Sequence, residues 1–150
     1  MNLSEVVNKV INLSGKIRDY YDVEMPKRFP NYPLINSAAG ESEEDVPPPP
    51  EEKELSDFLA GLPEETIYQL YLLMHLGRWE FSANDLADNY ERLKKSVETA
   101  ENAVFEMTTF DSTLGDNLFD GLEELRQHKI NVDKMPLKKT KARKRVKSEQ

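Results

Sequence analysis

The sequence predicts an all-α protein: a small bundle of four to five helices, with a proline-rich acidic linker and a disordered basic C-terminal tail. Apolar residues recur at spacings of three and four along most of the chain, and glycines and prolines divide it into helix-length segments. Two strongly charged stretches offer little apolar surface for packing. We expect an N-terminal helix over 1–24, the linker over 25–50, the core over 51–130 and the tail over 131–150.

Residues 4–22 carry the first helical pattern. Ser4 is a candidate N-cap, and Gly15 weakens the middle of the helix by about 1 kcal/mol relative to alanine. The apolar stripe consists of Leu3, Val6, Val7, Val10, Ile11 and Ile17. We expect this stripe to be buried where the helix packs across the central helix of the bundle.

Prolines and acidic residues interrupt the pattern between Met25 and Pro50. Prolines remove backbone donors and the acidic residues repel one another, so we expect a linker. The run Pro47–Pro50 should form a short polyproline II rod ahead of the next helix. An apolar cluster within the linker either docks on the core or stays part of the linker, and the sequence leaves both open. Its members are Phe29, Tyr32, Leu34 and Ile35.

Two helices should meet at a tight corner near Pro63. Gly61 can end the first helix, and Pro63 suits the first turn of the second. The stripe of the first helix is Leu55, Phe58, Leu59 and Leu62. The second helix, 64–76, is apolar nearly all round, which predicts that it lies at the centre of the bundle.

The last two predicted helices follow this central one. Gly77 is a candidate C-cap, and Ser82 with Asp85 resembles a capping box that opens a long helix over 83–107. A polar break over 108–113 precedes the final helix, whose stripe is Leu114, Leu118, Leu122 and Leu125. Beyond Ile130 apolar residues are too sparse to offset the entropy of ordering the chain.

Charge divides the chain into an acidic body and a basic end. The net charge is −8, and residues 138–150 carry +6, so residues 1–137 carry −14. The tail could neutralise the phosphates of a nucleic acid, weakly and without sequence preference because it has no aromatic residue for stacking. It could equally fold back on the acidic body or associate with itself. The nucleic-acid candidates are Lys138, Lys139, Lys141, Arg143, Lys144, Arg145 and Lys147.

Motifs that carry chemistry are scarce. The chain has no cysteine, which excludes disulfides and thiolate nucleophiles, and its two histidines are too few for most histidine-based metal sites. It also has no nucleophile elbow, phosphate-binding glycine loop or paired-carboxylate motif. We therefore expect a protein that is not an enzyme and binds no cofactor or metal. With neither a secretory signal nor a run of about 20 apolar residues, we expect a soluble cytoplasmic protein without membrane contact.

The interaction candidates are His75, Arg78, Trp79 and Asp116. Arg78 and Asp116 each follow a glycine at a predicted helix boundary, so they could form a clasp between helices, which we favour, or line one pocket. His75 could act as a general base or ligand with Glu80, but a core histidine is the preferred interpretation. Trp79, Phe81, Tyr68 and Tyr71 could form an exposed aromatic patch, although such residues more often belong to the core. If the corner after Gly77 faces solvent, Trp79 is the best candidate for the centre of a protein-binding surface.

A family resemblance rests on the segments Leu55–Leu62, Leu72–Arg78 and Leu114–Leu118, with Gly121-Leu122 after them. In this order and spacing, residues 54–126 resemble a bacterial family, domain of unknown function 3775. The resemblance implies a helical domain and no specific activity. The chain departs from the family where His75 takes a position that is often aromatic, and where Trp79-Glu80 replaces a Gly-Asp pair.

The functional prediction is a non-catalytic protein-interaction module that binds a partner protein near Trp79 and is compatible with a homo-oligomer. The alternative is an accessory nucleic-acid-binding protein that acts through its basic C-terminal tail.

Overall fold

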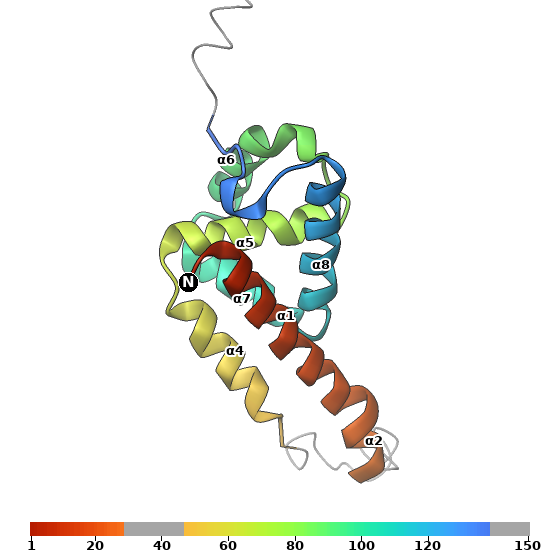
Figure 1. Ribbon diagram of the computed structural model, residues 1–150. Helices are drawn as coiled ribbons and strands as arrows, with labels where there is room; N and C mark the ends of the chain where they lie inside the picture. The colour runs from red at the N-terminus through yellow and green to blue at the C-terminus, as the bar shows by residue number, and fades with distance from the viewer. Residues whose placement is uncertain (29–46, 139–150) are drawn as a thin grey trace, which may run out of the picture.

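The computed structural model describes residues 1–28 and 47–138, and within these ranges every regular element is a helix, which confirms the all-α prediction. The helices of ten residues or more are α1 (Leu3–Asp19), α4 (Pro50–Ala60), α5 (Glu64–Gly77), α6 (Leu86–Val97), α7 (Ala100–Thr109) and α8 (Asp111–Gln127) (Figure 1). Four shorter elements in the described part are η1 (Tyr20–Glu24), α2 (Met25–Arg28), η3 (Ala83–Asp85) and η4 (Val132–Lys134). Among the described residues, no helix has the length and apolar character needed to cross a bilayer.

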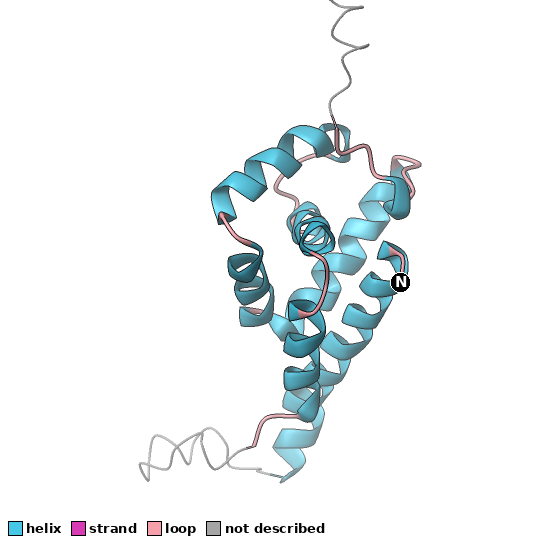
Figure 2. Cartoon of the chain, turned by 90° about the vertical axis from the view of Figure 1, so that its left-hand side faces the viewer, coloured by secondary structure: helices cyan, strands magenta, loops and turns pink. Residues whose placement is uncertain are grey.

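Helix α5 is the centre of the bundle, as predicted. Its residues from Leu70 to Gly77 are all buried, as is Ile67. Figure 2 shows α5 nearly end-on, with the other long helices around it. Because this helix is apolar on nearly every side, only a position enclosed by neighbours removes its surface from water.

The N-cap of α1 lies two residues before Ser4, the expected cap, and the helix begins at Leu3. Asn2 is the cap, because its side chain accepts a hydrogen bond from the Glu5 amide at 2.9 Å and the Glu5 carboxylate accepts one from the Asn2 amide at 2.9 Å. The helical path continues through η1 and α2 to Arg28, past the start expected for the linker. The π-helical turn precedes Pro26, which has no amide hydrogen for a regular helical bond.

The prediction that the N-terminal helix packs across the central helix is wrong. Helix α1 lies chiefly against α8 and α4, and α8 in turn packs on α5 (Figure 1). Two glycines of α8 make both contacts close: a Cβ on Gly115 would lie 3.0 Å from the Ser14 side chain, and one on Gly121 would lie 2.5 Å from the Leu73 carbonyl oxygen. Helix α8 therefore joins α1 to the centre of the bundle.

Gly77 completes the contact between α5 and α8. A Cβ at this position would lie 1.7 Å from the Asn117 carbonyl oxygen, so only glycine fits without moving the backbone. The prediction that Gly77 caps α5 is wrong, because the residue is still helical and the chain leaves the helix after it. What the glycine provides is space for α8.

The prediction of one long helix over 83–107 is also wrong, because this segment is divided into η3, α6 and α7. Glu98 has a φ of 74° and the Thr99 amide donates to the Val97 carbonyl at 2.9 Å, a strained three-residue turn. Thr99 then caps α7 by accepting from the Asn102 amide at 3.0 Å. Ser82 does act as a cap, since its hydroxyl accepts from the Asn84 amide at 3.1 Å in η3.

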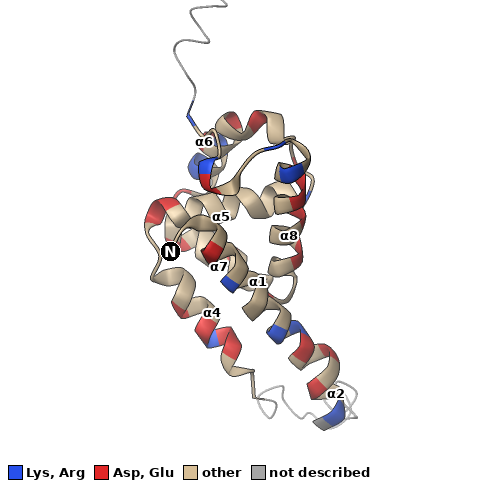
Figure 3. Cartoon of the chain, viewed as in Figure 1, with Lys and Arg blue, Asp and Glu red and all other residues tan. Residues whose placement is uncertain are grey.

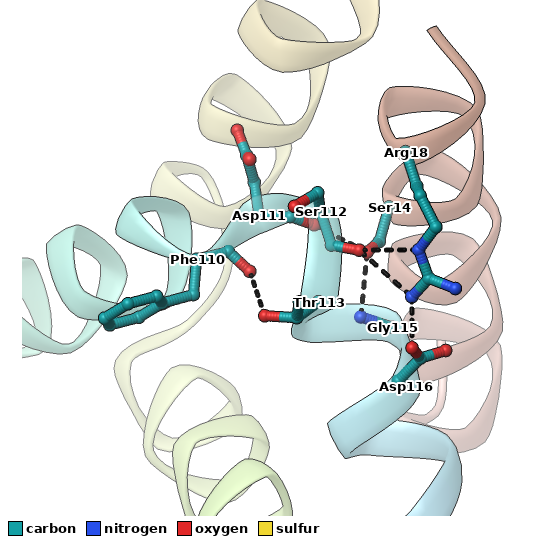
Figure 4. A network of polar contacts seen from close by, with 8 residues as sticks. All are labelled: Ser14, Arg18, Phe110, Asp111, Ser112, Thr113, Gly115 and Asp116. Carbon is teal, nitrogen blue, oxygen red and sulfur yellow. Dashed lines mark hydrogen bonds and ion pairs between the residues drawn. The ribbon is translucent and has the colours of Figure 1, made fainter. Parts of the chain in front are cut away.

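The polar break predicted over 108–113 shrinks to Phe110, with α7 on one side and α8 on the other. Figure 4 shows why α8 can begin so early: α1 supplies hydrogen bonds to its first turns. The Ser14 hydroxyl donates to the Asp111 carbonyl at 2.5 Å, and Arg18 donates to the Ser112 carbonyl at 3.2 and 3.1 Å. The Ser14 side chain is fully buried, so its hydroxyl is shielded from water.

The described chain continues past the boundary expected near residue 130. The Ser4 amide donates to Asp133 at 2.9 Å, and Val132, Met135 and Leu137 pack on the core. Ahead of α4, Pro49 is extended as the proline rod requires, but Pro50 is already the first helical residue. The linker cluster Phe29, Tyr32, Leu34 and Ile35 lies outside the described residues, as does the chain from residue 139.

Candidate interaction surface at the end of helix α5

Trp79 lies two residues after the last residue of α5, at the position directly after the C-cap Arg78, where glycine is usual. Its amide donates to the Leu76 carbonyl at 3.0 Å and the Glu80 amide donates to the His75 carbonyl at 3.4 Å, a pair of bonds that requires a left-handed residue at Trp79. The φ of Trp79 is 64°. A side chain in this conformation costs about 1–2 kcal/mol, and Trp79 nevertheless leaves 71% of its surface exposed. Burial of the indole therefore does not compensate for the strain.

Arg78, which precedes Trp79 in the chain, contacts a second exposed aromatic residue, Phe110. The guanidinium carbon of Arg78 lies 5.9 Å from the centre of the Phe110 ring, a cation–π contact, and Phe110 is 50% exposed. The Nε of Arg78 lies 3.7 Å from a carboxylate oxygen of Glu80. We name the group Arg78, Trp79 and Phe110 the Trp79 surface.

His75 supports the corner from beneath. It is 8% exposed, its Nδ1 lies 2.7 Å from a carboxylate oxygen of Glu80, and its ring meets that of Tyr71 edge-on at 4.5 Å. The Tyr71 hydroxyl donates to Glu106 at 2.9 Å, and burial together with this bond raises the pKa of Tyr71. His75 thus connects the first residues after α5 to α7.

The surroundings of His75 do not resemble a metal centre. Its Nε2 is buried without a hydrogen-bond partner, and Glu106 approaches it only to 3.9 Å. Across residues 1–28 and 47–138, no group of three or more histidine, aspartate and glutamate side chains could hold a metal ion. These contacts agree with the interpretation of His75 as a core histidine.

The clasp between Arg78 and Asp116 is not formed. Asp116 pairs with Arg18 of α1 (Figure 4). Arg78 pairs with Glu80. Gly77, which precedes Arg78, packs on Asn117 of α8, whereas Asp116 lies where α8 meets Arg18 of α1. The two residues consequently belong to different helix contacts, and neither pairs with the other.

Sequence reasoning missed the contributions of Phe110 and Glu106. Phe110 was assigned to a polar break, although an aromatic residue beside the last helix was a visible signal. Glu106 had no signal, because its contact with Tyr71 depends on how α7 packs against α5. Of the seven nucleic-acid candidates only Lys138 lies in the described ranges, in a depression lined also by Glu64 and Glu65, and the other six fall outside them.

No family model matches the chain, and the comparisons with curated proteins and with solved structures give no match. The resemblance to family 3775 therefore stays a prediction.

Proposed function

We propose that this chain is a non-catalytic protein-interaction module that binds a partner protein through the Trp79 surface. The observation that carries the proposal is the exposure of Trp79 in a strained conformation. The left-handed backbone serves the fold because it ends α5, but glycine would adopt it without strain, so the choice of tryptophan is what needs another reason. Strained residues of this kind are concentrated at functional sites. An exposed tryptophan that the fold does not need is a candidate for contact with another molecule.

The chemistry of the Trp79 surface supports a protein as the partner. Tryptophan and arginine are the residues most enriched among those that dominate binding energy, and aromatic residues are enriched at interfaces generally. The contact of Arg78 with the Phe110 ring holds both side chains in place before binding, which lowers the entropy cost of ordering them. His75 and Glu80 fix the backbone beneath.

The test compares the tagged full-length chain with two variants in recovery of proteins from a lysate of the source organism. Trp79→Gly removes the indole and the strain together. Phe119→Ala is the matched control, because Phe119 is 53% exposed on α8 and lies about 200° around that helix from Asn117, the residue that faces Gly77. All three chains are compared in thermal unfolding.

We expect the wild type and Phe119→Ala to recover the same protein and Trp79→Gly to lose it. With the partner purified, a central tryptophan should contribute about 2 kcal/mol or more, a loss of roughly 30-fold in affinity. Unchanged recovery by Trp79→Gly together with a lower melting temperature would show that Trp79 serves the fold and would refute the proposal.

A further inference from the structure

A second surface lies beside α7 and is formed by other residues than the Trp79 surface. It is an open groove of about 460 Å³ between α7 and the corner that joins α4 to α5. Its apolar lining includes Leu62 and Ile67 on one side and Val104 and Phe105 on the other. Phe105 is 73% exposed although it belongs to a helix that packs on the core. An apolar hollow with an exposed aromatic wall is unusual for a surface that meets only water.

The dimensions of the groove suit a short helical segment. Ala100, Val104 and Thr108 line it from α7 at intervals of four residues, so the lining extends over two helical turns, about 12 Å. A guest helix of similar length presents three apolar side chains on one face, at spacings of three and four.

The charge around the groove decides what kind of segment it takes. Glu64 and Glu101 line it, both are exposed, and none of its lining residues is basic. Helices α5 and α7 contain no lysine or arginine, and Figure 3 shows acidic residues along the neighbouring helices as well. A partner with lysine or arginine beside its apolar stripe would pair with these carboxylates, whereas an acidic partner would be repelled.

The same comparison disfavours two other occupants. A second copy would bring an acidic body, −14 over residues 1–137, against an acidic groove. The basic end of this chain has the right charge, but residues 139–150 offer only Ala142 and Val146 as apolar side chains, too little to cover Leu62, Ile67 and Phe105. We propose that the groove binds an amphipathic helix of another protein, with an apolar stripe flanked by lysine or arginine.

The experiment uses the full-length chain and two synthetic helix-forming peptides labelled with fluorescein. One carries leucines at i, i+4 and i+7 with lysines on both flanks, and the other carries glutamates at the lysine positions. Binding is followed by fluorescence anisotropy over a range of salt concentrations. We expect saturable binding of the lysine peptide that weakens with salt, and binding of the glutamate peptide that is at least about tenfold weaker.

Four variants place the binding in the groove. Ala60→Trp, at an exposed lining position, should fill the hollow and abolish binding, and Phe105→Ala should weaken it. Glu64→Gln with Glu101→Gln should weaken it several-fold and flatten the salt dependence. Trp79→Gly is the control and should bind like the wild type, so that failure here and failure of the proposed function are distinguishable. Circular dichroism establishes that each variant is folded.

Several results would overturn the inference. Absence of saturable binding, or equal binding of both peptides, would show that the groove does not select a basic helix. A dimer in sedimentation velocity that Ala60→Trp disperses would assign the groove to a second copy. Binding that appears only after deletion of residues 139–150 would assign it to the chain's own end.

Discussion

The amide of Gly115 donates a hydrogen bond to the hydroxyl of Ser14 at 2.8 Å, across the contact between α8 and α1. The same hydroxyl donates to the Asp111 carbonyl, the group four residues earlier with which a regular helix would pair the Gly115 amide. Ser14 therefore acts as a bridge within the first turns of α8 (Figure 4). Since α8 also packs on α5, this bridge ties the N-terminal helix to the centre of the fold.

Replacement of Ser14 by alanine should lower the free energy of unfolding by about 1–3 kcal/mol, because the buried Gly115 amide and the part-buried Asp111 carbonyl lose their common partner. The control is Ser96→Ala on the exposed face of α6, which should change stability by less than about 0.5 kcal/mol. Urea denaturation measures both. Equal effects of the two substitutions would show that the hydroxyl does not hold α1 to α8.

Alanine substitutions at two helical glycines should have opposite signs. Gly77→Ala places a methyl group against the Asn117 backbone and should destabilise the fold by about 1–3 kcal/mol or more. Gly15→Ala meets no atom within 4 Å and should stabilise it by about 0.5–1 kcal/mol. Thermal unfolding of both variants tests the close contact of α5 with α8. A Gly77→Ala protein as stable as the wild type would contradict that contact.

Two substitutions at Trp79 should separate strain from side-chain contacts. Trp79→Gly suits the left-handed conformation and should be more stable than Trp79→Ala by about 1–2 kcal/mol, because alanine keeps the strain. Chemical denaturation gives the difference directly. If both variants are equally unstable relative to the wild type, the indole itself holds the corner.

Asp111→Asn should stabilise the protein at neutral pH. Burial and then the charge of Glu52 raise the pKa of Asp111. A carboxyl with a raised pKa binds its proton more tightly in the folded state, so its contribution to stability is greatest in acid and is lost as pH rises through the raised range. The gain from Asp111→Asn should disappear below the ordinary aspartate pKa of about 3.9.

Unfolding of Asp111→Asn and wild type across a pH series measures this, with Asp120→Asn at an exposed position of the same helix as control. A gain that is constant with pH would show that the carboxyl charge of Asp111 is not its cause.

The central helix could be predicted because its own sequence determines its place: a segment without a polar face has to be enclosed. The division at Glu98 could not be predicted from the apolar stripe, which runs on through Val97, Ala100 and Val104 as if the helix continued. Thr99 with Asn102 was the available signal, since the pair caps the start of α7.

The candidate site was predictable in part. Trp79 was identified by its residue type, but its exposure depends on the left-handed turn that ends α5. That turn was hard to predict because tryptophan stands where glycine is expected. The prediction that Arg78 pairs with Asp116 was wrong, because an exposed guanidinium pairs with whichever carboxylate the packing of helices brings near. Glu80, adjacent in the turn, took the place assigned to Asp116.

The most direct test of the proposed function uses the single tryptophan of the chain. With 5-fluorotryptophan at position 79, the ¹⁹F resonance of the full-length protein should resemble that of the urea-unfolded chain, because the indole is in water. Addition of the co-purified partner should shift or broaden it, while the Phe119→Ala protein responds identically. A resonance unchanged at saturating partner would contradict the assignment of Trp79 to the interface.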